Sequence, residues 1–382
     1  MQPSPYTPGV VAKAVPGRTA QLAFYEERAQ LIANLGQFVG SVRVDYAARG
    51  VGKTSLLREA ERLFERYDIS TVWVTAVEGE SLAASILDEL RKLLPKTKRL
   101  AELTDLVDSA TVTIGGGPVQ AGVTIKPGQR GASAAGKVFM NVVSDVTDAM
   151  RDAGEAGLVI LVDEIQAADK QSLRTISVAW QELASAKSPP AAGLFTVGLP
   201  GSQDHITNAV TFSERFDFVE LSGIDAGGAA TALHRPAADM GVVWDQPAIA
   251  AGVAAAQGYP YKVQLVGEGA WVAAGRPDPG QRITIEHLDE GMSYVNEKMR
   301  SLFAARWRNS SKGQRELLSA IASLGGVDVK REDVAARMGK TTQAISVPRD
   351  RLLSKGIIDA SRRGRLSFTV PGFTEYILEQ LD

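Results

Sequence analysis

The segment with the clearest chemical pattern is residues 47–54, Ala-Ala-Arg-Gly-Val-Gly-Lys-Thr, between a predicted strand and a predicted helix. It matches G-x-x-x-x-G-K-[ST], except that Ala47 replaces the first glycine. The two glycines let successive backbone N–H groups point at one phosphate, and the helix that opens at Lys53 directs its positive dipole end there. We expect Lys53 to reach the β- and γ-phosphates of a nucleotide and the Thr54 hydroxyl to bind Mg²⁺. A plain glycine turn is the alternative.

Two carboxylates, Asp163 and Glu164, follow the apolar run of residues 158–162. An apolar run without alternation is typical of a strand buried on both faces of a parallel sheet. Its acids then lie at the carboxyl edge of the sheet, where ligands of α/β proteins bind. We expect Asp163 to hold Mg²⁺ through water, and Glu164 to polarise the water that attacks the γ-phosphate. A role as a helix N-cap is the alternative for such a pair.

A parallel sheet is needed to position these groups, and the sequence predicts one. The predicted strands are residues 42–47, 70–77, 158–162, 193–198 and 217–221. The first three predicted helices are residues 21–35, 53–67 and 81–94. This alternation is typical of βαβ units. Residues 111–126 differ, because two short β-rich runs flank a glycine turn there, and we expect an inserted β-hairpin.

The predicted fold is α/β: a P-loop NTPase αβα sandwich with a parallel sheet, followed by a helical lid and a winged-helix domain. The expected domains are a Pro-rich arm at 1–20, the P-loop domain at 21–222, the lid with a connecting helix at 223–308, and the winged helix at 309–382. The lid is Ala-rich and is interrupted by Gly258-Tyr259-Pro260.

Composition excludes several classes of protein. The 382 residues include 42 Lys and Arg against 44 Asp and Glu, so the overall charge indicates no particular partner. The absence of cysteine excludes disulfides, thiolate metal sites and thiol catalysis. The three histidines, His205, His234 and His287, lack metal-ligand spacing. No apolar run approaches the ~20 residues that span a bilayer, so we expect a cytoplasmic protein without a membrane partner.

The C-terminal module is more basic than the rest of the chain. Residues 309–382 carry twelve Lys and Arg against nine Asp and Glu. Helices at 314–324, 331–338 and 341–355, followed by strands near 357–358 and 366–370, predict a winged helix whose third helix enters the major groove of duplex DNA. Pro348 is anomalous inside that third helix. A winged helix used for protein contacts is the alternative.

The residues expected to bind DNA are those of the third helix and the wing. Base or phosphate contacts are expected from Thr341, Thr342 and Gln343, and phosphate contacts from Arg349, Arg351, Lys355, Arg362, Arg363 and Arg365.

The chain resembles the AAA+ ATPases of the origin-recognition type. The resemblance rests on residues 50–57, the Asp163-Glu164 strand, the strand end at 198–200 and the run 213–216. It implies ATP or ADP with Mg²⁺ as cofactors. It also implies that Arg215 approaches a γ-phosphate, within the chain or from a neighbouring subunit, and that residues 16–18 lie against the adenine. A surface arginine is the alternative for Arg215.

Two departures from this family bear on turnover. No clear polar sensor follows the fourth strand, since Gly198 occupies the expected position and Ser202 is a weak substitute. The lid carries Gly258-Tyr259-Pro260 where origin-recognition proteins usually have a sensor arginine, and Gly-x-Pro resembles the STAND class of slow nucleotide switches. The predicted cofactor-binding residues are Arg18, Arg49, Gly50, Val51, Gly52, Lys53, Thr54, Ser55 and Pro260, and the predicted catalytic residues are Lys53, Glu164 and Arg215.

Together these features predict an ATP-binding protein with slow Mg²⁺-dependent hydrolysis that couples nucleotide state to DNA binding. One alternative is a STAND-like switch that binds protein partners and hydrolyses little ATP. Another is the helper ATPase of a mobile element or defence system, which forms a homo-oligomer on DNA.

Overall fold

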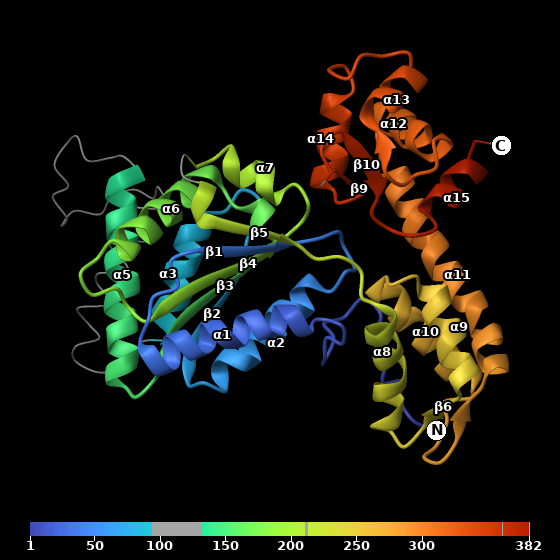
Figure 1. Ribbon diagram of the computed structural model, residues 1–382, viewed down its shortest axis with the longest axis horizontal. Coiled ribbons are helices and arrows are strands. Elements are labelled where there is room, and N and C mark those ends of the chain that lie inside the picture. The colour runs from blue at the N-terminus through green and yellow to red at the C-terminus, as the bar shows by residue number, and fades with distance from the viewer. Residues whose placement is uncertain (94–131, 211–212, 361, 382) are drawn as a thin grey trace.

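The computed structural model describes residues 1–93, 132–210, 213–360 and 362–381 (Figure 1). The hairpin predicted at 111–126 lies outside these ranges. Figure 1 shows an α/β part, a helical part and a C-terminal part, with the long helix α11 (Ile285–Arg308) leading from the second to the third. Within the described ranges, no helix has both the length and the apolar character needed to cross a membrane.

Among the residues that the structure describes, five parallel strands form the central sheet in the spatial order β2-β3-β4-β1-β5. They are β1 (Val42–Tyr46), β2 (Ile69–Thr75), β3 (Gly157–Asp163), β4 (Ala192–Gly198) and β5 (Phe216–Glu220). Every residue of β3 and β4 is buried, as expected from their apolar runs without alternation. The five predicted strands are confirmed.

Helices cover both faces of this sheet. The helices on one face are α1 (Thr19–Leu35) and α2 (Lys53–Glu65), and those on the other are α3 (Leu82–Leu93), α5 (Ala132–Asp152) and α6 (Lys170–Ala184). Strand β3 supplies both cores, because Val159 and Leu161 pack with α1 and α2 whereas Leu158 and Ile160 pack with α3, α5 and α6. The predicted αβα sandwich is therefore confirmed.

Three short helical segments lie near strand ends. They are η1 (Ile165–Ala167) after β3, α7 (Ser202–Thr207) after β4 and η2 (Ser213–Arg215) before β5.

The helical part also holds the N-terminal arm. Its elements are α8 (Ala226–Ala238), β6 (Val243–Trp244), α9 (Gln246–Ala256), α10 (Pro260–Ala273), β7 (Arg282–Ile283) and α11. Tyr6 is buried against Trp244 and Trp271. The Tyr6 hydroxyl accepts a hydrogen bond from Trp244 Nε1 at 2.8 Å and donates one to the Leu233 carbonyl. The Pro-rich segment is thus anchored in the helical part.

The described residues of the C-terminal part form four helices and a three-stranded antiparallel sheet in the order β8-β10-β9. The elements are α12 (Lys312–Ser323), β8 (Val329–Lys330), α13 (Arg331–Arg337), α14 (Ser346–Ser354), β9 (Ile358–Asp359), β10 (Arg365–Phe368) and α15 (Phe373–Glu379). The helix α15 was not predicted from the sequence.

The predicted start of the third C-terminal helix, at residue 341, was wrong. Residues 342–345 form turns, and α14 begins at Ser346. Pro348 consequently lies in the first turn of α14, where backbone N–H groups have no partner within the helix. The late start of the helix removes the anomaly of a proline in a helix interior.

Candidate nucleotide-binding site

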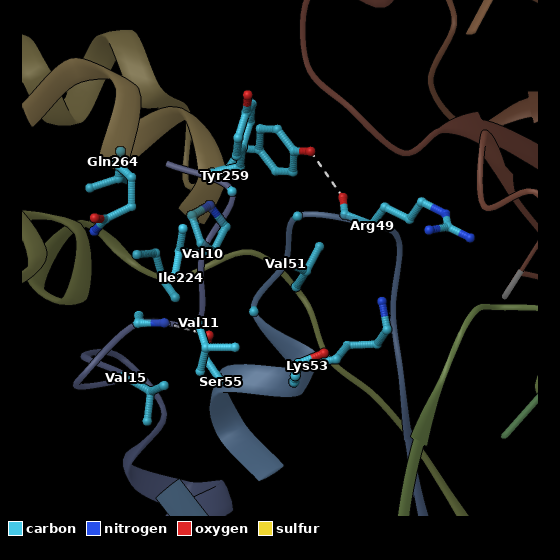
Figure 2. Close-up of a pocket in the computed structure, with 18 of the residues that line it drawn as sticks. Val10, Val11, Val15, Arg49, Val51, Lys53, Ser55, Ile224, Tyr259 and Gln264 are labelled. Atoms are coloured by element: carbon cyan, nitrogen blue, oxygen red, sulfur yellow. Dashed lines mark hydrogen bonds between the residues drawn. The ribbon is translucent and has the colours of Figure 1, made fainter. Parts of the chain in front are cut away.

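A cavity of about 800 Å³ lies where the three parts and the N-terminal arm meet. This volume is in the range of small-molecule sites. Figure 2 shows an apolar side, with Val10, Val11 and Ile224, and a cationic side, with Lys53 and Arg49. The cavity is lined by Glu164 and by all the predicted cofactor-binding residues: Arg18, Arg49, Gly50, Val51, Gly52, Lys53, Thr54, Ser55 and Pro260.

The loop between β1 and α2 has the backbone that its glycines predict. Gly50 and Gly52 have φ of 84° and 90°, in the left-handed region that glycine adopts without strain. A Cβ at position 50 would lie 2.2 Å from the Tyr259 hydroxyl. Ala47 is buried, and its N–H donates to the Gly198 carbonyl at 3.0 Å, so alanine fits at the first position of the motif.

Lys53 is a buried cation at the start of α2, with 6% of its surface exposed. Its Nζ donates to the Ala48 carbonyl at 3.0 Å. Burial lowers the pKa of Lys53 to about 8, Glu164 and Asp163 oppose this shift, and Arg49 adds to it. An ammonium has three N–H donors. Within the described residues one of them is satisfied, so Lys53 retains donors for a phosphate.

Thr54 and Asp163 bring two oxygen ligands together. Thr54 Oγ1 donates to Asp163 Oδ2 at 2.8 Å, and the Glu164 N–H donates to Asp163 Oδ1 at 2.8 Å. Burial raises the pKa of Asp163, and these hydrogen bonds oppose the shift. Oxygen ligands suit Mg²⁺, which takes further ligands from phosphates and water. The described residues contain no group of three or more acidic or histidine ligands, so such an ion would have to be completed by the nucleotide.

Gln166 holds Glu164 in place and was missed by sequence reasoning. Glu164 has φ of 54°, and its carboxylate accepts a hydrogen bond from the Gln166 amide nitrogen. The Gln166 Oε1 accepts from the Leu199 N–H at 2.9 Å and lies 3.5 Å from the Ser202 hydroxyl. A Cβ at Gly198 would lie 2.2 Å from Ser202 Oγ, so a larger sensor residue does not fit at this position without movement.

The helical part and the arm are bonded directly to the glycine-rich loop. The Tyr259 hydroxyl donates to the Arg49 carbonyl at 2.9 Å (Figure 2), and the Tyr261 N–H donates to the Gly50 carbonyl at 3.1 Å. The Ala12 N–H donates to Ser55 Oγ at 3.0 Å. The Gly-x-Pro pattern in the sequence indicates this part of the lid, but it does not predict these hydrogen bonds to the glycine-rich loop.

Arg18 and Arg215 have different positions. Arg18 is buried, and its Nη2 donates to the Val51 carbonyl at 3.0 Å, which fixes the arm beside the loop. Arg215 is half-buried in η2 and is not among the described residues that line the cavity.

The predicted DNA-binding residues lie on the turn before α14, on α14 and in the β9–β10 hairpin. Arg349 pairs with Asp350 at 2.6 Å, and Arg362 and Arg365 lie 3.5 and 3.6 Å from Asp328. The remaining members are mostly exposed: Thr341, Thr342, Gln343, Arg351, Arg363 and Lys355, which follows α14 and also lines the cavity. Two arginines of the β9–β10 hairpin are thus partly neutralised by one acid.

Comparisons with known proteins extend these observations. The ORC2 protein of Aeropyrum pernix in ADPNP–ADP complexes matches with a TM-score of 0.57 and 14% identity, over 96% of this chain and 95% of that one. A Walker-type ATPase of Pyrococcus abyssi matches with a TM-score of 0.58 and 14% identity, over 99% of both chains. A domain of unknown function (DUF8462) matches residues 300–377, and no curated protein sequence matches the chain. Over nearly its whole length, the chain has the fold of the origin-recognition-like AAA+ ATPases.

Proposed function

We propose that this chain is an ATP-binding AAA+ protein that hydrolyses ATP slowly with Mg²⁺. The proposal rests on one observation: the glycine-rich loop, the buried cation Lys53 and Glu164 all line the same cavity. The apolar side, with Val10, Val11 and Ile224, suits a purine base, and the cationic side suits the phosphates.

Each residue has a distinct role in this proposal. Lys53 and the N–H groups of the loop hold the β- and γ-phosphates. Thr54 and Asp163 are positioned to hold Mg²⁺, which supplies charge neutralisation at the phosphates when bound. Glu164, fixed by Gln166, accepts a proton from the attacking water. Arg215 is not among the described residues that line the cavity, and we assign it no role within this cavity.

ATP affinity is expected to fall at high pH, because Lys53 must be charged to hold phosphates. With a pKa of about 8, Lys53 is protonated below that pH and loses its charge above it. The phosphates are fully ionised above pH ~7. Tyr259, whose pKa burial raises to about 12, stays neutral in this range. ATP titrations should give constant affinity up to about pH 8 and then a decline toward about tenfold per pH unit.

The Lys53→Ala variant is the control for this pH dependence, because it removes the titrating group. Its weaker affinity should not change between about pH 7 and 9.5. A wild-type affinity that is equally flat over this range would contradict the role given to Lys53.

We also propose that the C-terminal part is a winged helix that binds duplex DNA. Support comes from the exposed cations on α14 and the β9–β10 hairpin. If Arg362, Arg363 and Arg365 each contact a phosphate, replacing all three by alanine should flatten the plot of log affinity against log salt by about 2.7. The loss should be similar for all sequences, whereas changes at Thr342 or Gln343 should alter sequence preference.

A matched control is Arg235→Ala, which removes an exposed arginine from α8 outside the C-terminal part. It should leave the salt slope unchanged. A triple variant with the wild-type slope would contradict the DNA proposal, as would a wild-type protein without DNA binding at about 50 mM salt, where phosphate contacts are strong.

The second candidate function is a nucleotide-controlled switch that binds protein partners. The observation that favours it is the pairing of three of these arginines within the C-terminal part, Arg349 with Asp350 and both Arg362 and Arg365 with Asp328. Pairing of this kind reduces the charge available to DNA phosphates.

A further inference from the structure

Two cations from outside the α/β part line the candidate nucleotide cavity. Arg306 comes from the last turn of α11, and Lys355 follows α14. With Arg18, Arg49 and Lys53, they make five cations on the described lining, against the single acid Glu164. An excess of positive charge around a cavity favours an anionic ligand.

Arg306 has an unsatisfied donor within this cluster. Its Nη1 is buried and has no hydrogen-bond partner among the described residues. Burial lowers the pKa of Arg306, the neighbouring Tyr259 opposes that shift, and the charge on Arg49 lowers the pKa further. A buried guanidinium nitrogen without a partner is costly, and a charged acceptor is the group that offsets this cost best.

Lys355 differs from Arg306, because two of the three donors of its ammonium have partners. Its Nζ donates to the Asn309 carbonyl at 2.7 Å and to Gln314 Oε1 at 3.0 Å. Lys355 therefore ties the end of α14 to the junction of α11 and α12. Arg306 lies in the last turn of α11, so a ligand that it binds would lie next to this junction, where the C-terminal part begins.

We propose that Arg306 donates hydrogen bonds to the polyphosphate chain of the bound nucleotide. The inference rests on the proposed ATP binding and adds to it a phosphate ligand supplied by α11. Arg–phosphate pairs are strong because the guanidinium presents several parallel donors. The nucleotide would then join the glycine-rich loop to the helix that leads into the C-terminal part.

The test compares ATP with adenosine, which has the base and sugar but no phosphates. Dissociation constants are measured by calorimetry for the wild-type full chain and for Arg306→Gln, Arg306→Lys and Arg308→Gln. Arg308 is exposed on the same turn of α11 and does not line the cavity, so Arg308→Gln is the matched control. We expect Arg306→Gln to weaken ATP binding about tenfold or more, with adenosine affinity unchanged. Arg306→Lys should recover part of the loss, and Arg308→Gln should behave as wild type.

Two results would overturn the inference while leaving the proposed function intact. One is wild-type ATP affinity in Arg306→Gln. The other is an equal loss for ATP and adenosine, which would mean that Arg306 shapes the cavity without contacting phosphate. Failure of the proposed function gives a different result. In that case the wild-type chain would bind no ATP, or Lys53→Ala would bind ATP as tightly as wild type. Either result would also overturn the inference about Arg306.

Discussion

Replacing Glu164 by glutamine is expected to lower the rate of ATP hydrolysis about 100-fold or more while ATP binding persists. Glutamine keeps the size of the side chain and retains an oxygen that can accept the hydrogen bond from Gln166. It cannot take a proton from the attacking water, so the loss falls on the chemical step. Phosphate release under saturating ATP measures the rate, and an ATP titration of the same variant measures binding.

Glu78→Gln is the matched control for this variant. Glu78 is an exposed acid that follows β2, at the same edge of the sheet as Glu164, and it does not line the cavity. Its variant should hydrolyse ATP at the wild-type rate. Equal rates in wild type and Glu164→Gln would remove Glu164 from the proposed mechanism, and an absence of wild-type hydrolysis would favour the switch.

Replacing Lys53 by alanine is expected to weaken ATP binding tenfold or more. The variant removes a charged hydrogen-bond donor from the phosphate side of the cavity, and such a contact is worth ~1.5–3 kcal/mol. The wild-type side chain is buried and donates to the Ala48 carbonyl, so the fold of the variant is checked by circular dichroism. Calorimetric titration with ATP and Mg²⁺ gives the affinity.

The control for this second variant is Lys170→Ala, which removes an exposed lysine at the start of α6. It should bind ATP as wild type does. Unchanged ATP affinity in a folded Lys53→Ala protein would contradict the assignment of the loop between β1 and α2 as the phosphate-binding element.

Local patterns were sufficient to predict the sheet and its loop. The buried strands β3 and β4 are unbroken apolar runs, and Gly50 and Gly52 supply the positive φ that the loop before α2 adopts. Such features depend on residues close in sequence. The same reasoning placed Lys53, Thr54 and Glu164 on one edge of the sheet, and the structure brings them together.

The remaining parts of the site depend on contacts between distant residues. Arg306 reaches the cavity through the packing of α11 on α10, and nothing in the local sequence around position 306 indicates that its Nη1 is buried. Gln166 is held by hydrogen bonds to the Glu164 carboxylate and the Leu199 N–H, and these two residues follow different strands, β3 and β4. The wrong helix start at residue 341 has another cause. The predicted helix includes residues 341–345, whereas α14 begins at Ser346, so the prediction places Pro348 in the interior of the helix.

The most direct test is a calorimetric titration of the wild-type chain with ATP in the presence of Mg²⁺ near pH 7, below the pKa of Lys53. The cavity that holds the glycine-rich loop, Lys53 and Glu164 predicts saturable binding of one ATP per chain. Addition of excess ADP should compete for the same site. A titration without saturable binding at millimolar ATP would contradict the proposal that this cavity is a nucleotide site.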